Sequence, residues 1–343
     1  MDSITHIAVG AVIGEAIMGK KIGKRAMLLG AIAQSLPDID FIASFFLSTA
    51  NDLLAHRGFT HSFLFALIAA LLLALISERW HRPHNISLQK WLVFYGIEIF
   101  THLFLDAFNS YGTGWFEPFS HLRVSFNALF VADPFFSVWC GIALIALLVL
   151  RADNEKRKYW VQISLAASTC YLLYALYNKS TIHTVVEKNL TEQHITSRRF
   201  FATPTALNSW LWYIVAEDEN GFHIGYRSVF DRDPSIAFHY FPRQQNLLEK
   251  VQQKEDIQHL VRFSQGYYTL DDIGDTLVFN DLRFGQIMGW QNPQAGFAFH
   301  YYVELTDAND LVIQRGRFTG WNMKTVRALI TRIKGTDRRR SNE

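Results

Sequence analysis

Apolar residues are distributed unevenly along the 343-residue chain, and this asymmetry restricts its fold more than any other feature. Residues 1 to about 178 are dense in Leu, Ile, Ala and Phe, whereas the remainder is polar and aromatic. The mean hydropathy of +0.06 averages these two halves and conceals the difference. Because a chain of this length usually forms about two domains, we expect a membrane-embedded helical domain followed by a soluble domain.

Four stretches of the first half approach the ~17–25 apolar residues that a membrane-spanning helix needs. They are residues 61–77, 91–108, 134–150 and 159–177. Shorter apolar helices are expected at about 4–19 and 26–36, the second of which runs into Pro37. The prediction for residues 1–180 is therefore an α-helical multi-pass membrane bundle of about four spanning helices plus two shorter helices.

Basic residues cluster in three loops of this half, at residues 20–25, 79–90 and 151–158. If the helices run alternately up and down, all three loops lie on one side of the membrane. Positively charged loops remain in the cytoplasm. The opposite helix ends and the chain after residue 178 are therefore expected on the extracytoplasmic side.

Residues 185–335 are predicted to form a separate extracytoplasmic α+β domain. Apolar and aromatic runs bounded by turn signals predict strands at 209–216, 222–230, 297–305 and 311–313. Apolar residues at helical spacing predict helices at about 243–262 and 322–333. Residues 336–343, which include Arg338, Arg339 and Arg340, are expected to be a solvated basic tail.

The composition excludes several classes of protein. A net charge of +2 provides no global basic field, so no nucleic-acid partner is expected. Cys140 and Cys170 both fall in apolar helices, so no disulfide framework is expected. The N-terminus lacks a basic region and a small-residue cleavage site, so we do not expect a removable signal peptide.

Metal-binding residue types gather in the apolar half, where burying a polar side chain is costly and marks a functional site. Imidazole and carboxylate groups suit zinc and other divalent ions. The candidate ligands are His6, Asp38, Asp40, His56, His61, His102 and Asp106. The segments that carry them reach a similar depth, ~18–25 Å from the basic loops at ~1.5 Å per helical residue. The sequence therefore predicts a site for one or two divalent ions, with zinc preferred, near the outer headgroup level.

Several of these residues have alternative roles. Asp38 and Asp40 could instead cap helix ends, and His6 could be a buried histidine bonded to a backbone carbonyl. Asp40 is predicted to be a ligand or the general base. Arg57 is predicted either to neutralise an anionic substrate or to pair with a site carboxylate.

Other ionisable residues are placed outside the central set. Glu98 shares a helix face with His102 and Asp106, and a structural role is as plausible for it as a place in the site. His183 and Glu187 have His-x-x-x-Glu spacing just after the last apolar helix, which is a weak ligand signal. Asp133 precedes Pro134 and is predicted to cap the helix that follows.

The same residues resemble those of a known family. The pieces MDSITH, SLPDID, HRGFTHS, THLFLD, NSYGTGWFEPFS and ADP occur in this order within residues 1–150. They resemble the YdjM-like family of LexA-binding, inner-membrane-associated proteins. The resemblance implies a multi-pass bacterial inner-membrane protein that acts as a metal-dependent hydrolase, with no established substrate.

A more distant likeness is to the zinc-dependent phospholipase C and P1 nuclease group. That group is helical and holds clustered zinc ions through His and Asp, with a His-x-x-x-Asp pair that His102 and Asp106 match. His183 and Glu187 could match the group's His-x-x-x-Glu pair. Its mature chain begins with a ligating residue exposed by processing, whereas this sequence begins at Met1, which leaves the number of ions open.

Together these observations predict a membrane-bound metal-dependent hydrolase in which a metal-activated water attacks an ester. The headgroup-level position suggests a phosphoester of a membrane lipid or lipid-linked substrate, with Asp40 and Arg57 as catalytic residues. Two other classes remain open. One is a non-enzymatic membrane regulator or scaffold with a structural metal, and the other is a metal or proton transporter. Whether the protein has a protein partner stays open.

Overall fold

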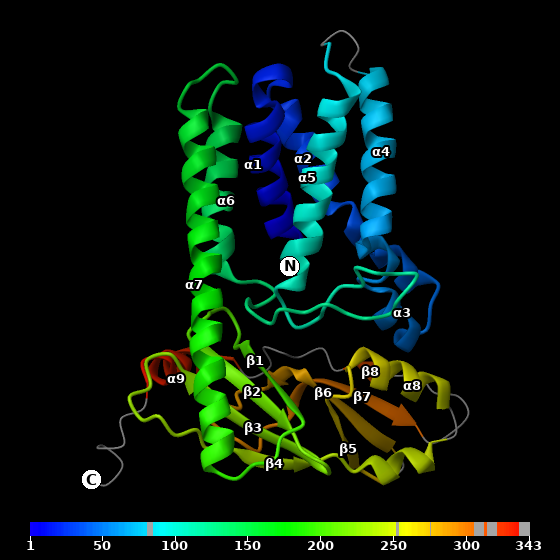
Figure 1. Ribbon diagram of the computed structural model, residues 1–343, viewed down its shortest axis with the longest axis vertical. Coiled ribbons are helices and arrows are strands. Elements are labelled where there is room, and N and C mark those ends of the chain that lie inside the picture. Colours follow the sequence, from blue (N-terminus) through cyan, green and yellow to red (C-terminus); the bar gives the residue numbers. More distant parts are fainter. Residues whose placement is uncertain (81–84, 252–253, 275, 305–311, 314–320, 336–343) are drawn as a thin grey trace. The chain divides into compact units, whose positions relative to one another are not determined.

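The computed structural model describes residues 1–80, 85–251, 254–274, 276–304, 312–313 and 321–335 (Figure 1). The chain divides into two compact units. Unit 1 comprises Met1–Phe46, Ala55–Tyr174 and Ala206–Asn208, and unit 2 comprises Leu47–Leu54, Ala175–Thr205 and the chain from Ser209 onward. The predicted basic tail, residues 336–343, lies outside the described residues.

Unit 1 is helical. Its α-helices are α1 (Ser3–Ile22), α2 (Arg25–Ser35), α4 (Phe63–Trp80), α5 (Leu88–Ala107), α6 (Pro134–Val149) and the first part of α7 (Arg157–Glu192), joined in part by the 3-10 helices η1 (Pro37–Phe45) and η2 (Phe59–His61). The interval predicted to separate the two domains, residues 181–184, lies inside α7. Aromatic residues of α5, including Trp91 and Phe94, form the core with the alanines of α4 (Ala66, Ala70).

The predicted bundle of about four membrane-spanning helices is wrong. Among the described residues, one helix, α4, is long and apolar enough to cross a membrane; the pair α2 and η1, bent by 53°, meets the same criteria together. The other helices lie where the sequence predicted them, but α6 has only 16 residues. In α5, Lys90, Glu98, His102 and Asp106 interrupt the apolar run that a span requires.

Local signals explain where the first two helices begin and end. Asp2 caps α1, because its side chain accepts a hydrogen bond from the Thr5 amide at 3.0 Å. The helix ends at Gly23, which adopts a positive φ of 59° that favours glycine. The chain can then reverse directly into α2.

Glycines allow the backbones of α1 and α2 to touch. A Cβ atom added to Gly30 would lie 2.2 Å from the carbonyl oxygen of Gly10, and one added to Gly14 would lie 2.2 Å from that of Ala26. Contacts of this kind require small residues on both helices. The close packing brings the end of α2, and η1 directly after it, beside the start of α1.

Unit 2 contains two four-stranded antiparallel sheets, each with its strands in sequence order. The first sheet consists of β1 (Arg199–Pro204), β2 (Leu211–Glu217), β3 (Gly221–Ser228) and β4 (His239–Pro242). The second consists of β5 (Tyr268–Asp272), β6 (Thr276–Gln286), β7 (Phe297–Glu304) and β8 (Val312–Ile313). The unit also holds α3 (Thr49–Ala55, up to Leu54), the 3-10 helix η4 (Gln245–Lys250), α8 (Lys254–Phe263) and α9 (Met323–Ile333).

Strand alternation divides the core of this unit into layers. Trp212 and Ile214 of β2 face the second part of α7, where Ile182 and Val186 pack against them. The intervening Tyr213 points to the opposite face, as expected for alternate residues of a strand, and belongs to a cluster with residues of the second sheet. The predicted strands correspond to β2, β3, β7 and β8, whereas the helix predicted at 243–262 is instead the separate helices η4 and α8.

Candidate metal centre

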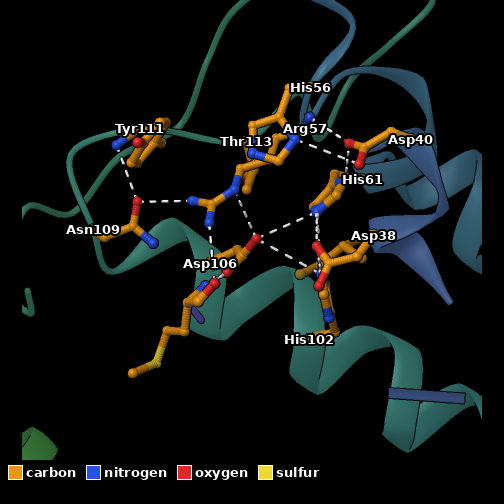
Figure 2. A network of polar contacts seen from close by, with 12 residues as sticks. Asp38, Asp40, His56, Arg57, His61, His102, Asp106, Asn109, Tyr111 and Thr113 are labelled. Atoms are coloured by element: carbon orange, nitrogen blue, oxygen red, sulfur yellow. Dashed lines mark hydrogen bonds and ion pairs between the residues drawn. The ribbon is translucent and has the colours of Figure 1, made fainter. Parts of the chain in front are cut away.

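Four side chains of unit 1 converge on one point. Asp38 comes from η1, His61 from η2, and His102 and Asp106 from α5 (Figure 2). Each offers one potential ligand atom, and these atoms all lie within 4.8 Å of one another. The side chains of His61, His102 and Asp106 are fully buried, whereas that of Asp38 is 22% exposed. We call these four residues the acceptor cluster.

Short-range sequence features position each member. Pro37 starts η1 directly after α2 and places Asp38 and Asp40 in its first turn. His102 and Asp106 are four residues apart on α5 and therefore share one face. Arg57 adopts a positive φ of 58° in the turn that leads into η2, which ends at His61.

The two histidines are oriented by oxygen atoms on their outer side. Nδ1 of His102 donates to the backbone carbonyl of Gln34 at 2.5 Å, and a carbonyl oxygen can only accept. Nδ1 of His61 lies 3.1 Å from Oγ of Thr60 and 3.5 Å from a carboxylate oxygen of Asp40. Both contacts favour the proton on Nδ1. We assign this tautomer to both rings from these contacts.

The consequence is that the two Nε2 atoms face each other with their lone pairs, at 3.1 Å. Carboxylate oxygens of Asp38 and Asp106 lie 3.3–3.6 Å from the same nitrogen of His61. These atoms are all acceptors, so they repel one another unless a cation lies between them. A histidine whose Nδ1–H is held by an oxygen while Nε2 points inward is typical of metal ligation.

Burial favours the neutral, ligating form of one histidine outside the helices that could span a membrane. Burial lowers the pKa of His61 well below its usual value, and the nearby Arg57 acts in the same direction, although Asp40 opposes it. His61 is therefore neutral near pH 7. Metal ligation requires this neutral imidazole.

Arg57 holds Asp106 in place. Its Nε lies 3.0 Å from Oδ2 of Asp106, and its Nη1 donates to Oδ1 of Asn109 at 2.8 Å. The guanidinium also lies over the ring of Tyr111, 4.9 Å from its centroid. Arg57 is buried, and its burial lowers its pKa, but a guanidinium remains charged near neutral pH. Of its two predicted roles, the geometry matches pairing with a site carboxylate.

Asp40 and His6 lie beside the acceptor cluster. Asp40 accepts from the backbone amide of Arg57 at 2.7 Å and approaches His61 from its outer side. His6 contacts Oδ1 of Asp106 through Nε2 at 3.1 Å, and its ring stacks on His102 at 3.9 Å between centroids. The amino group of Met1 also pairs with Asp106. Asp40 therefore orients His61, and His6 orients Asp106 and His102.

The remaining candidates lie farther from it. His56 is 38% exposed, and its Nδ1 lies 3.4 Å from Asp40. His183 and Glu187 form an exposed pair on α7 at 3.6 Å, within unit 2. Asp133 caps α6 by accepting hydrogen bonds from the amides of Phe135 and Phe136, as predicted.

Sequence reasoning missed the residues that support the cluster. Gln34 supplies the carbonyl that orients His102, and its side-chain amide nitrogen can donate to Oε2 of the buried Glu98 at 3.2 Å. Asn109 binds both Arg57 and the amide of Tyr111. The polar Gln34, which follows the apolar run 26–33 of α2, was a signal that could have identified this support.

A cavity of about 780 Å³ opens beside the cluster. Asp38, Asp40, His56, Arg57 and Tyr111 line it on the polar side. Asp38, the most exposed member of the acceptor cluster, is thus the one that a molecule in the cavity would meet.

Comparison with known proteins places these features in a wider group. The model of the YdjM inner membrane protein family matches residues 1–182. Inner membrane protein YbcI of Escherichia coli (strain K12) is 37% identical over 122 residues, which are 35% of this chain and 69% of that protein. The uncharacterized protein YfhP of Bacillus subtilis (strain 168) is 24% identical over 336 residues, 94% of this chain and 95% of that protein. No solved structure matches.

Proposed function

The chain belongs to the YdjM inner membrane protein family. We propose that it is a membrane-bound metal-dependent hydrolase. Asp38, His61, His102 and Asp106 would hold the ion. The observation that carries this proposal is the pair of buried Nε2 atoms facing each other at 3.1 Å. Without a cation that arrangement is unfavourable, because each nitrogen presents a lone pair to the other.

The donor set favours one zinc ion. Two imidazoles and two carboxylates suit zinc, and four atoms within 4.8 Å of one another match the ligands of a single ion. Catalysis would require that this ion also bind a water, either as a fifth ligand or in place of one carboxylate, and it would lower the pKa of that water toward neutrality. We infer one ion because His6, Asp40 and His56 contact cluster residues from outside the four-atom group.

The chain's own residues would divide the remaining work. Asp40 and the Gln34 carbonyl hold the two imidazoles in the ligating tautomer, and Arg57 fixes Asp106. Asp38 borders the cavity. A substrate ester placed there would be cleaved by addition of water at the acyl or phosphoryl centre, with the proton passing to the departing alcohol. We propose a phosphoester of a membrane lipid or lipid-linked molecule as the substrate.

The metal itself is tested first. The protein would be purified in detergent without chelator, and its metal content measured by mass spectrometry beside His61→Ala and His102→Ala. We expect one zinc equivalent in the wild type and a loss in both variants. His183→Ala, which changes an exposed histidine of α7, is the matched control and should retain the ion. A wild type without metal would overturn the proposal.

Hydrolysis is tested separately, on zinc-loaded protein. Release of p-nitrophenol from bis(p-nitrophenyl) phosphate and of headgroup from fluorogenic phospholipids should be abolished by chelation and restored by zinc. If metal is bound but none of these esters, nor carboxylic esters, is cleaved, the second candidate takes precedence. That candidate is a membrane regulator with a structural metal, favoured by the complete burial of three of the four ligands.

We also propose that the cluster faces the extracytoplasmic side, on the grounds of the basic loops. Reporter fusions at Lys90 and after Glu343 should report the cytoplasm and the outside, respectively. The same side for both would contradict this orientation.

A further inference from the structure

The cavity beside the acceptor cluster has two chemically different ends. Its polar end holds Asp38, Asp40, His56 and Arg57. Most of the remaining lining is apolar and includes five side chains from α1, α2, η1 and the junction of α2 with η1, namely Ile7, Ile32, Leu36, Ile39 and Phe41. Met1 and Val131 add to this apolar wall, and Asp2, Ser3, Ser35 and Tyr111 are the other polar residues of the lining. A volume of about 780 Å³ lies in the range of sites for small organic ligands, ~300–1,000 Å³.

The apolar wall is open to the outside of unit 1. Ile7, Ile32, Ile39 and Phe41 are between 42% and 61% exposed, although all four line the cavity. Their neighbours Ile4 and Leu28 are exposed as well. α2 and η1, which carry most of this wall, together meet the criteria for a membrane span. In an inner-membrane protein, such a wall is therefore placed to contact lipid hydrocarbon.

The geometry points to a groove for the hydrocarbon chain of an anionic membrane amphiphile, walled by Ile7, Ile32, Leu36, Ile39 and Phe41, with its ester group directed to the Asp38 end. This inference rests on the proposed function and specifies its substrate. A fully water-soluble ester would leave the five apolar side chains unmatched, whereas an alkyl or acyl chain buries apolar surface against them.

Charge selects the head of the ligand. Arg57 is already engaged with Asp106, so it is not a free anion receptor. Asp38 and Asp40 make the polar end acidic, and an anionic ester is accommodated there only when a divalent ion is present in the cluster. Binding of the hydrocarbon tail should therefore depend on the apolar side chains of the groove. Binding of the anionic head should depend on the divalent ion in the cluster.

The test measures binding of hexyl, octyl and decyl phosphate, each below its micelle concentration, to the full-length protein in amphipol by calorimetry. In the zinc-loaded wild type, we expect affinity to rise about three- to fourfold per methylene group that enters the groove. Ile32→Trp, which fills the groove, and Ile32→Asn, which makes it polar, should both reduce this chain-length dependence strongly.

Leu28→Trp is the matched control, because Leu28 lies one turn earlier on α2, is also exposed (62%, against 51% for Ile32), and does not line the cavity. It should behave as the wild type. Equal chain-length dependence in the wild type and all three variants would overturn the groove. His102→Ala separates the two proposals, since it should lose metal and head affinity but retain the chain-length dependence. If the dependence is present while the wild type cleaves no ester, the groove stands and the hydrolase proposal fails.

Discussion

Each unit of the molecule buries acidic groups, but it surrounds them differently. In unit 2, Asp281 is fully buried and faces the guanidinium of Arg283, with a shortest contact of 2.6 Å. Glu217 likewise accepts hydrogen bonds from both Arg199 and Arg243. Every one of these carboxylates meets a donor, so the groups are complete as they stand.

In the acceptor cluster of unit 1, carboxylates also face other acceptors. Oδ2 of Asp106 pairs with Nε of Arg57 at 3.0 Å, but it also lies 3.3 Å from Nε2 of His61 and 3.6 Å from Nε2 of His102. These two Nε2 atoms point at each other and at Asp38. Buried acceptors that face one another without a donor between them are costly. The difference therefore indicates that the ion pairs of unit 2 stabilise the fold, whereas the acceptor cluster of unit 1 is built for a cation.

The largest expected effect comes from replacing one buried aspartate by asparagine in each unit and comparing the loss of stability and of metal. Asp106→Asn and Asp281→Asn each leave a buried arginine without its carboxylate, which typically costs ~3–5 kcal/mol. Both variants should therefore show a clearly lower Tm in detergent. Only Asp106→Asn should also lose its metal. Loss of metal in Asp281→Asn, or its retention in Asp106→Asn, would remove the distinction between the units.

The pH dependence of stability should also carry opposite signs in the two units. Burial raises the pKa of Asp133, the cap of α6, to about 6. Because its folded pKa lies above the unfolded one, its contribution is fully present below pH ~4 and is lost as the pH rises through about 6, by up to ~3 kcal/mol. Tm measured between pH 4 and 7 should fall through this range, and Asp133→Asn should flatten the profile. A profile unchanged by that substitution would argue against this assignment.

A smaller loss of metal affinity should distinguish residues that orient the ligands from the ligands themselves. Asp40→Asn removes a carboxylate that approaches His61 from its outer side, and loss of such a contact typically weakens metal affinity ~10–100-fold. Competition with a zinc chelator would measure the change. His56→Ala is the control, since His56 approaches Oδ1 of Asp40, whereas Oδ2 of Asp40 is the oxygen that approaches His61, and this change should alter affinity less. Complete loss of metal in Asp40→Asn would make Asp40 a ligand instead.

The smallest effect concerns Glu217. Although burial acts in the opposite direction, the hydrogen bonds from Arg199 and Arg243 lower the pKa of Glu217. Its contribution to stability is therefore present above the usual pKa of a glutamate, ~4.3, and is lost as the pH falls through the lowered value. Glu217→Gln should reduce acid sensitivity below pH ~4 while leaving the profile above pH 5 as in the wild type. If Glu217→Gln altered the stability profile near pH 6, the assignment of that part of the profile to Asp133 alone would be contradicted.

Local patterns predicted the helices of unit 1 well but not their relation to the membrane. Apolar runs and Pro37 located α2, and Asp133 with Pro134 located the start of α6. The prediction of four spans counted α5 as a span despite His102 and Asp106, which serve the cluster. In unit 2, β1, β4, β5 and β6 escaped prediction because strands are stabilised by partners distant in sequence, which a single run of residues does not reveal.

The site was predictable as a set of residue types but not as a geometry. The His102–Asp106 spacing and the Pro-Asp-Ile-Asp turn suggested convergence, and the structure brings Asp38, His61, His102 and Asp106 together. Spacing could not distinguish a residue that faces the cluster from one that approaches a histidine from behind, as Asp40 does. That distinction depends on which ring nitrogen each oxygen meets, and so on tertiary contacts.

The glycine contact between α1 and α2 also limits how the cavity can change its width. Where Gly10 meets Gly30 and Gly14 meets Ala26, backbone lies directly against backbone, and no side chain can change rotamer to absorb a displacement. The two helices are thus coupled mechanically and are expected to move as one stiff body. Ile7 of α1 and Ile32 of α2 are therefore held at a fixed separation in the lining of the cavity.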